Sequence, residues 1–443
     1  GSKFISFFMV PLYTLAMNTK QFGQVDLVIT TVNLFLPIAT LSLFDAVFRF
    51  AMDKEQDPAK VFSSGFFSTI FLSMVIIGIS PILNLLHIRY LNYFLAILVI
   101  TSLFTLTQNF ARAIGKTYTY AVAGIVNAFV FAVLNVIFLI YLKMNVTGYL
   151  ASYFLAMLIS FIFVLFSIRI WRYFKPRKYS IKLTKKMLRY SIPLIPNSLA
   201  WWLTNDASRY FILTFVGIAG NGLFAVANKI PTVINMFFNV FTQAWQISAV
   251  DEYSSKDRSE YYSNVFKSVQ SVLFILVALF LLIEKPFMHV FVAASYYSAW
   301  MYIPILLLSV IFSNMSAFLG TVYLAAKRTS GIFYTTILGM VVNLIISFCL
   351  TPRIGIYGTS LGGALGFLVV VLLRLKDIKK YIVVKMQWDG FVFSLCGLCV
   401  MIIGLFLDYV YFEVLYLVVG CFMVLFVNRG TLKGMLNTLV MIA

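Results

Sequence analysis

Continuous apolar runs separated by short polar stretches dominate this sequence. A helix needs about 20 apolar residues to cross a bilayer, and the runs are unbroken rather than alternating, which favours a helical bundle over a membrane β-barrel. The pattern therefore predicts an all-α membrane protein with about 14 transmembrane helices. The expected segments are residues 1–16, 24–50, 61–86, 91–113, 118–142, 147–172, 187–215, 221–247, 262–283, 299–326, 332–351, 355–375, 391–408 and 411–427.

The basic residues between these segments predict the orientation of the chain. Most of the 34 lysines and arginines lie in the loops after even-numbered segments and in the C-terminal tail. The loops after odd-numbered segments contain only Lys20, Arg89, Lys143, Lys285 and Arg353. Because basic loops stay on the cytoplasmic side, we expect a multi-pass protein of the plasma membrane with both termini in the cytoplasm.

Short motifs recur in the same order in the two halves of the chain. LAMNTKQFGQVDLV contains Gly23 and VGIAGNGLFAVANK contains Gly222, while Gly148 and Gly358 open later segments of each half. Six segments per half make the repeats parallel. The predicted architecture is two six-helix lobes around a central cavity plus two extra C-terminal helices. Its expected parts are an N-lobe (1–172), a basic cytoplasmic linker (173–186), a C-lobe (187–380) and the last two helices with the tail (381–443).

Composition removes several classes of function. The chain is 62% hydrophobic and 11% charged, with a mean hydropathy of +0.95. Its net charge of +19 comes mostly from short loops, so no nucleic-acid partner is predicted. Cys396 and Cys399 form a CxxC inside LCGLCVM with no His nearby, which is typical of helix packing rather than of a metal site. The chain has no GK[ST] phosphate loop and no nucleophile–base set, so we predict neither an enzyme nor a cofactor.

Seven ionisable residues lie inside the apolar segments. A charge near the bilayer centre costs roughly 3 kcal/mol, so it usually faces water or a partner. We place Asp26 near the outer, hydrated end of its segment. Because four of the seven are cations, the default hypothesis is an anion site. The seven are Lys3, Asp26, Asp45, Arg49, Asp206, Arg209 and Lys229.

The segment 221–247 carries a polar stripe. With the 100° step of an α-helix, seven amide and hydroxyl side chains fall within about 60° of one face. Such a stripe indicates either hydrogen bonding between helices or the wall of a wet cavity. We favour the wall, which could hydrogen-bond a sugar-like ligand. The stripe is Asn228, Thr232, Asn235, Asn239, Thr242, Gln243 and Gln246, with Lys229 beside its outer end.

Two acid–base pairs permit opposite interpretations. Asp45 and Arg49 share a helix face at i,i+4, and Asp206 and Arg209 do so at i,i+3, with Asn205 adjacent. Each pair could simply neutralise itself. Alternatively, the arginines face a cavity and the acids tune them, since a guanidinium offers phosphate two parallel hydrogen bonds. Pro37, about two turns before Asp45, predicts a kink.

Over residues 1–375 the chain resembles the Wzx-type polysaccharide flippases of the multidrug/oligosaccharidyl-lipid/polysaccharide (MOP) exporter superfamily. The resemblance rests on the order and spacing of several stretches. They are SKFISFFMVPLYT, QFGQVDLV, FARAIGKTYTYAVAGIVN, YSIPLIPNSLAWWLTNDASRYFI, GLFAVANKIPTV, FTQAWQISAVDEY, AAKRTSGIFYTT and GIYGTSLGG.

The resemblance implies transfer of undecaprenyl-pyrophosphate-linked oligosaccharide across the bacterial plasma membrane by alternating access. The cationic cavity residues of the family would correspond to Lys3, Arg49, Arg209 and Lys229. We expect the sugars to meet Asn205, Asn228, Asn235, Asn239, Gln243 and Gln246. It also implies coupling to a cation gradient, H⁺ or Na⁺, with Asp45 or Asp206 as the coupling acid. The expected partners are the lipid-linked oligosaccharide, membrane lipids and polysaccharide assembly proteins such as a polymerase and a chain-length regulator.

Three alternatives stay open. A peptidoglycan-precursor or teichoic-acid-type flippase would share the fold and the site. A multidrug/cation antiporter of the same superfamily would need a more acidic, more apolar pocket. A membrane scaffold or glycan-modifying enzyme would need an acid or metal motif in an outer loop, and the sequence offers none.

Overall fold

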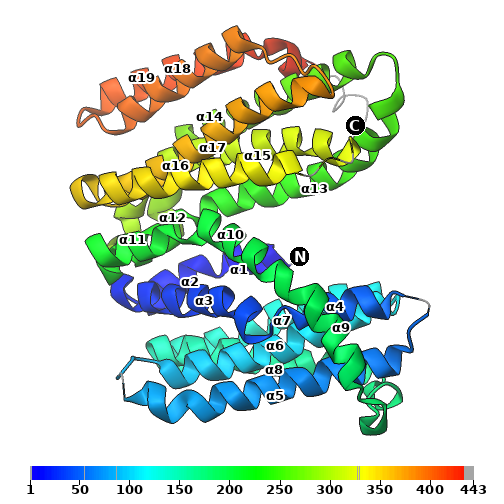
Figure 1. Ribbon diagram of the computed structural model, residues 1–443. Coiled ribbons are helices and arrows are strands. Elements are labelled where there is room, and N and C mark those ends of the chain that lie inside the picture. Colours follow the sequence, from blue (N-terminus) through cyan, green and yellow to red (C-terminus); the bar gives the residue numbers. More distant parts are fainter. Residues whose placement is uncertain (1, 54, 86, 327, 329, 434–443) are drawn as a thin grey trace, which may run out of the picture. The chain divides into compact units, whose positions relative to one another are not determined.

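The computed structural model describes residues 2–53, 55–85, 87–326, 328 and 330–433, and within these ranges it is helical without strands (Figure 1). Twelve of the described helices are long and apolar enough to cross a membrane. The predicted all-α membrane fold is therefore confirmed, but the predicted count of about 14 is not. The two expected segments without a single long helix are residues 1–16 and 187–215, which are divided into shorter helices.

Contacts divide the chain into two compact units, one of residues 1–210 with 217–225 and one of residues 211–216 with 226–443. The predicted division at residues 173–186 stays a prediction. The helices that lie wholly in the first unit are α1 (Ser2–Phe8), α2 (Val10–Ala16), α3 (Thr19–Ala39), α4 (Leu43–Ala51), α5 (Pro58–Asn84), α6 (Leu91–Ala113), α7 (Thr117–Asn135), α8 (Asn145–Ser167), α9 (Ile181–Ser191) and α10 (Ile195–Asp206).

Two short helices, α11 (Ser208–Phe215) and α12 (Ile218–Ala227), contribute residues to both units. The remaining helices all belong to the second unit. They are α13 (Lys229–Asp251), α14 (Arg258–Phe291), α15 (Ile303–Ala325), α16 (Ser330–Ile354), α17 (Ile356–Asp377), α18 (Trp388–Leu405) and α19 (Val410–Val427).

Prolines explain where the segments break. Pro37 lies two residues before the end of α3, and Leu41 and Ser42 then adopt positive φ angles of 49° and 50° before α4 begins. A proline removes one helical hydrogen bond and clashes with the preceding turn, so the kink predicted at Pro37 is a complete break. Pro11 separates α1 from α2, and a 3₁₀ turn containing Pro193 separates α9 from α10, for the same reason.

In the first unit, α4 is the centre of a buried cluster. Leu43 and Val47 are fully buried against Phe62 of α5 and Phe110 of α6, whose rings lie 4.6 Å apart. Figure 1 shows α5, α6 and α8 running side by side below α4. This packing fixes α4 although it is only nine residues long.

Helices α3 and α12 meet at two glycines within the first unit. A Cβ atom on Gly23 would lie 2.1 Å from the carbonyl oxygen of Ile218, and one on Gly222 would lie 2.0 Å from that of Thr19. Both distances are far below van der Waals contact, so only glycine permits this approach. Close backbone contact at small residues is a general means of packing membrane helices. The contact places Asn221 next to the first turns of α3.

In the second unit, α15 is the most buried span and packs against α17, which pairs in turn with α16. The α18–α19 hairpin packs on α14 (Figure 1). An ion pair of 2.9 Å between Lys285 and Glu413 joins α14 to α19, and the Lys285 ammonium also lies 4.6 Å from the centre of the Trp300 ring. Because α14 continues to Phe291, well beyond the predicted end at residue 283, these charges belong to a helix and not to a loop.

The glycine contact predicts that Gly23→Ala destabilises the protein by about 2–4 kcal/mol, since its methyl group has no space and the backbone must shift. Thermal unfolding in detergent measures this effect. Gly124→Ala is the matched control, because nothing lies within 4 Å of a Cβ there and alanine is the better helix former. Equal melting temperatures for the two variants would contradict the proposed contact.

Candidate functional site

Arg209 is the centre of a polar cluster built within the first unit. The guanidinium comes from the start of α11, and its two acids come from α3 and from the end of α10. Its Nε donates to Oδ2 of Asp26 at 2.7 Å, and its Nη1 donates to Oδ1 of Asp206 at 2.6 Å. The sequence-predicted pair Asp206–Arg209 therefore forms, and a third residue joins it from a helix 180 positions earlier in the chain.

Asn221 of α12 completes the cluster. Its Nδ2 donates to Oδ2 of Asp26 at 3.3 Å and to the Gly23 carbonyl oxygen at 3.2 Å. The Phe224 ring, one turn later, lies 5.9 Å from the Arg209 guanidinium carbon. The glycine contact between α3 and α12 thus positions an amide and an aromatic face beside the ion pair.

Neighbouring hydrogen bonds fix α10 and α11 against α3. The Trp202 indole donates to the Thr30 carbonyl oxygen at 3.1 Å. The Thr31 hydroxyl and the Tyr210 hydroxyl lie 2.7 Å apart, and the Trp202 and Tyr210 rings are 5.5 Å apart. Residues before and after Arg209 in the chain are therefore bonded to α3, which limits the rotamers that the Arg209 side chain can adopt.

The cluster has an excess of negative charge. Two carboxylates share one guanidinium, so the three groups carry a formal charge of −1 when both acids are ionised. The side chains of Arg209 and Asp26 are each 15% exposed, whereas that of Asp206 is 29% exposed. Among the described residues, Asp206 accepts one hydrogen bond and Asp26 accepts two. Asp206 is therefore the more accessible of the two acids.

Asp45 and Arg49 do not form the ion pair that the sequence allowed; within the described residues no ion pair involves either of them. Asp45 lies half-buried in the first turn of α4, and Arg49 lies exposed in its last turn. Each charge thus sits at the helix end whose dipole favours it. Arg49 remains accessible to an anionic ligand.

Helix α13 exposes part of its predicted polar stripe. Thr232, Asn239, Gln243 and Gln246 are exposed. Asn235 instead accepts a hydrogen bond of 2.8 Å from Asn314 of α15, and nearby Trp245 is buried, stacked on Phe318 and bonded to Thr321 at 3.0 Å. Asn235 therefore serves hydrogen bonding between helices. The exposed members of the stripe remain accessible, as the wall of a wet cavity would require.

The other expected residues lie as follows. Lys229 begins α13 and is half-buried, as is Asn228 immediately before it, while Asn205 is exposed on α10. Lys3 belongs to α1, but its side chain lies outside the described part of the chain. Among the seven ionisable residues singled out in the sequence, Arg209 thus pairs with both Asp206 and Asp26.

Sequence reasoning underestimated Asp26 and missed Asn221. The expectation of a hydrated Asp26 was wrong, because its carboxylate is largely buried against Arg209. Two glycines in the sequence could have indicated this contact. Gly23 lies three residues before Asp26, and Gly222 follows Asn221 in the matching motif of the second half. Small residues mark places where helices approach closely, but the sequence does not say which glycine meets which.

Glu284 was also missed. Its side chain is fully buried in α14, and neither carboxyl oxygen has a hydrogen-bond partner in the part of the chain that the structure describes. The predicted helix ended at residue 283, which assigned Glu284 to a loop. Pro286 lies inside α14. Because a proline usually ends a helix, it concealed in the sequence that the helix continues.

A double-mutant cycle on the stability of the folded protein tests the cluster. We expect a coupling energy of about 2 kcal/mol between Asp26→Asn and Arg209→Gln, and about 1 kcal/mol between Asp206→Asn and Arg209→Gln, because the second acid is more exposed. The exposed pair Lys178–Asp57, at 41% and 43% exposure, is the control and should give less than about 1 kcal/mol. Equal coupling for all three pairs would show that burial does not strengthen the Arg209 interactions.

Comparisons with known proteins agree with this fold. The structure of an inward-facing multidrug resistance MATE family transporter of the MOP superfamily has a TM-score of 0.67 and 16% identity, covering 88% of this chain and 94% of that one. The lipid II flippase MurJ, in an inward closed conformation, has a TM-score of 0.60 and 13% identity, covering 98% and 97%. An outward-facing MATE family transporter has a TM-score of 0.53 and 13% identity, covering 90% and 91%.

At these identities the structures establish the fold alone. No curated protein matches the chain by sequence. The family model described as polysaccharide biosynthesis protein matches residues 1–246, which is more than half of the chain and includes α1 to α12 with the Arg209 cluster. The family resemblance noted in the sequence is thereby confirmed: this multi-pass membrane protein belongs to the polysaccharide biosynthesis protein family and has the fold of the MOP superfamily transporters.

Proposed function

We propose that the protein is a flippase that moves undecaprenyl-pyrophosphate-linked oligosaccharide across the plasma membrane. The observation that carries the proposal is Arg209, a guanidinium kept within apolar helices of a polysaccharide-family protein by two acids. A cation in this setting is costly, and a pyrophosphate is the kind of ligand that would compensate the cost in transport. Membership of the family supplies the glycan part of the substrate.

Each group of residues has a distinct role in this proposal. Arg49, Arg209, Lys229 and Lys3 contact the pyrophosphate, with Arg209 offering the two parallel hydrogen bonds that suit a phosphate. The accessible amides Asn239, Gln243 and Gln246, with Asn205, Asn228 and Asn235, hydrogen-bond the sugars. The polyprenyl tail stays in the lipid while the headgroup crosses.

A cation gradient drives the cycle through the acids of the cluster. Protonation of Asp206 brings the cluster from −1 to neutral and weakens the hold of that acid on Nη1 of Arg209. The freed nitrogen is then available to a phosphate oxygen. A ligand shifts a conformational equilibrium only by its difference in affinity for the two states, and this exchange of partners supplies such a difference. Asp45 is the second candidate for the coupling acid, and H⁺ or Na⁺ is the coupling ion.

A multidrug/cation antiporter is a second candidate, and one observation favours it. The formal charge of −1 on the Arg209 cluster suits a cationic ligand better than an anionic one, and MATE family transporters share the fold. A flippase for peptidoglycan or teichoic-acid precursors also fits, since MurJ shares the fold and is a lipid II flippase. Partners such as a polymerase or a chain-length regulator belong to the main proposal only.

The first prediction is that Arg209→Ala abolishes flipping of a fluorescent lipid-linked oligosaccharide in proteoliposomes and weakens its binding by at least about 2 kcal/mol, because one partner of a buried charge pair is removed. Arg209→Lys should recover only part of the activity, since lysine lacks the planar fork. Arg353→Ala, an exposed arginine at the end of α16, is the control. Flipping at the wild-type rate in Arg209→Ala would show that Arg209 does not bind the substrate. Transport of a cationic drug by the wild type, without transport of the oligosaccharide, would support the multidrug/cation antiporter instead.

The second prediction concerns coupling. Asp206→Asn imitates the protonated acid, so it should keep binding the substrate while flipping no longer responds to an imposed proton gradient. The wild type should flip faster when such a gradient is applied. Parallel measurements with a sodium gradient identify the ion. A variant that responds to both gradients like the wild type would exclude Asp206 as the coupling acid.

A further inference from the structure

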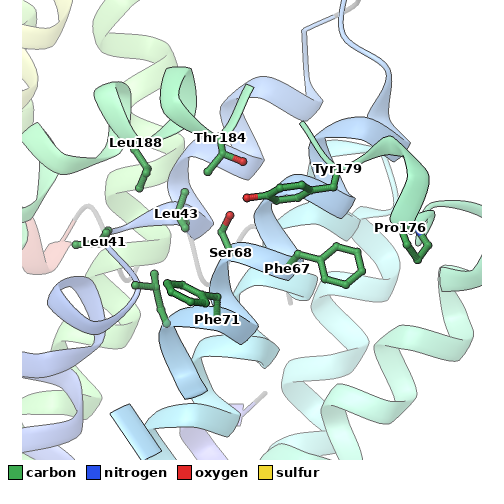
Figure 2. A pocket seen from close by; sticks show the side chains of 10 residues that line it. Leu41, Leu43, Phe67, Ser68, Phe71, Pro176, Tyr179, Thr184 and Leu188 are labelled. Carbon is green, nitrogen blue, oxygen red and sulfur yellow. The ribbon is translucent and has the colours of Figure 1, made fainter. Parts of the chain in front are cut away.

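The first unit contains a pocket of about 660 Å³ that is separate from the Arg209 cluster (Figure 2). Residues of helices α4, α5 and α9 and of the turn Pro176–Lys178 line it, and it is open on one side. Most of its lining is apolar, including Leu43, Phe67, Phe71 and Leu188. This volume lies within the range of ligand sites of about 300–1,000 Å³, and the lining suits a hydrocarbon chain.

The pocket is accessible from the apolar surface of α5. Phe71, which lines it, is 66% exposed, and Met74, on the next turn of the same helix, is 64% exposed. Exposed apolar side chains of this kind on a membrane-spanning helix suit contact with lipid. A hydrocarbon chain can therefore enter the pocket from the bilayer without crossing water.

Three hydroxyl groups converge inside this apolar lining. Figure 2 shows the oxygens of Ser68, Tyr179 and Thr184 pointing toward one another. The Ser68 hydroxyl donates to the Ser64 carbonyl oxygen at 2.8 Å. Thr184 is 8% exposed, and its hydroxyl has no hydrogen-bond partner among the described residues. A buried hydroxyl without a partner is costly, and a polar group of a ligand in the pocket would remove that cost at Thr184.

Helix α9 carries a strongly basic face above the pocket. Its buried side consists of Leu183, Thr184, Met187 and Ser191. The opposite side exposes four cations, which make no ion pair with any described residue. They are Lys182, Lys185, Lys186 and Arg189. A short helix with one apolar and one basic face is typical of a segment that lies on an anionic membrane surface.

Asp57 fastens the segment before α9 to α5. Its carboxylate accepts from the Ala59 backbone N–H at 2.9 Å and pairs with Lys178 at 2.5 Å. The Lys178 hydrogen bond holds the pKa of Asp57 below its usual range. Lys178 is thus already neutralised, and the four cations of α9 remain for a ligand.

We propose that this pocket is a binding site for one anionic glycerophospholipid of the surrounding bilayer. One acyl chain occupies the apolar pocket, the ester oxygens accept hydrogen bonds from the hydroxyls of Tyr179 and Thr184, and the phosphate lies against the cations of α9. The charge on α9 decides between phospholipids, because an anionic headgroup gains from four cations and a zwitterionic headgroup gains much less. Such a lipid would bridge α9 to α4 and α5.

Competition between lipids in nanodiscs tests the proposal, with bound lipid measured by native mass spectrometry. The wild type should retain phosphatidylglycerol over phosphatidylcholine by at least about tenfold, given about fivefold per cation near a phosphate. Replacing Lys182, Lys185, Lys186 and Arg189 by Gln should reduce this preference to about twofold. The control removes the same charge from exposed residues of the second unit, by changing Lys256, Lys267, Lys376 and Lys379 to Gln, and should keep the wild-type preference. An equal loss of preference in both quadruple variants would mean that only the net charge matters, which overturns the site.

Two further variants test the pocket itself. Leu188→Trp should fill it and remove the tightly retained lipid of either headgroup. Thr184→Val keeps the shape of the side chain and removes its hydroxyl, so it should lower retention of phosphatidylglycerol about threefold or more. This variant also tests the pocket if Leu188→Trp does not fold. Wild-type retention in Thr184→Val, with Leu188→Trp either lipid-binding or unfolded, would overturn the proposal. So would retention of a polyprenyl phosphate that phosphatidylglycerol does not displace, because the pocket would then belong to the transported substrate.

Discussion

A guanidinium among apolar helices is the constraint on which the first unit depends. Arg209 cannot be left unpaired there, since an isolated charge in a medium of low polarity is strongly disfavoured. The chain meets this requirement with Asp26 and Asp206, which come from two other helices. Asp26 could not reach Arg209 if α3 stood farther away. The close approach of Gly23 and Gly222, the broken segment around Pro193 and the bond from Trp202 to Thr30 therefore all serve the same geometry.

Using two acids for one base has a functional consequence. Protonation of one acid would leave a single pair with an uncompensated positive charge, whereas it leaves this trio neutral, with one acid still bound to the guanidinium. The two acids differ in burial and in hydrogen bonding, so they need not respond together. In the proposed flippase, a substrate phosphate would compete with the same carboxylates for the same guanidinium, and thermodynamic linkage would then tie the cation to the substrate. In the flippase proposal, one small cluster would perform both binding and coupling.

The basic residues of the chain lie in at least two kinds of environment. Arg209 and Lys229 lie inside helical segments where a cation is expensive, while the cations of α9 lie on an exposed face where they cost little. A basic helix beside an apolar pocket with an unsatisfied hydroxyl fits a lipid better than it fits the transported glycan. Under both proposals, the separation of the two sites would allow the membrane composition to act on the protein without occupying the proposed transport site.

The sequence by itself determined the all-α membrane fold, the approximate segments, a bend at Pro37 and the polysaccharide biosynthesis protein family, because length, hydrophobicity and proline act locally. It also identified Asp206 and Arg209 as a pair, since residues three apart share a helix face. The tertiary structure alone decided that Asp26 and Asn221 join them, that Asn235 and Trp245 are packing residues, and that Asp45 and Arg49 stay apart. It also placed Ser68 and Thr184 in the lining of one pocket. These pairings depend on which helices meet and at what register, and a backbone contact between two glycines leaves no local trace of its partner in the sequence.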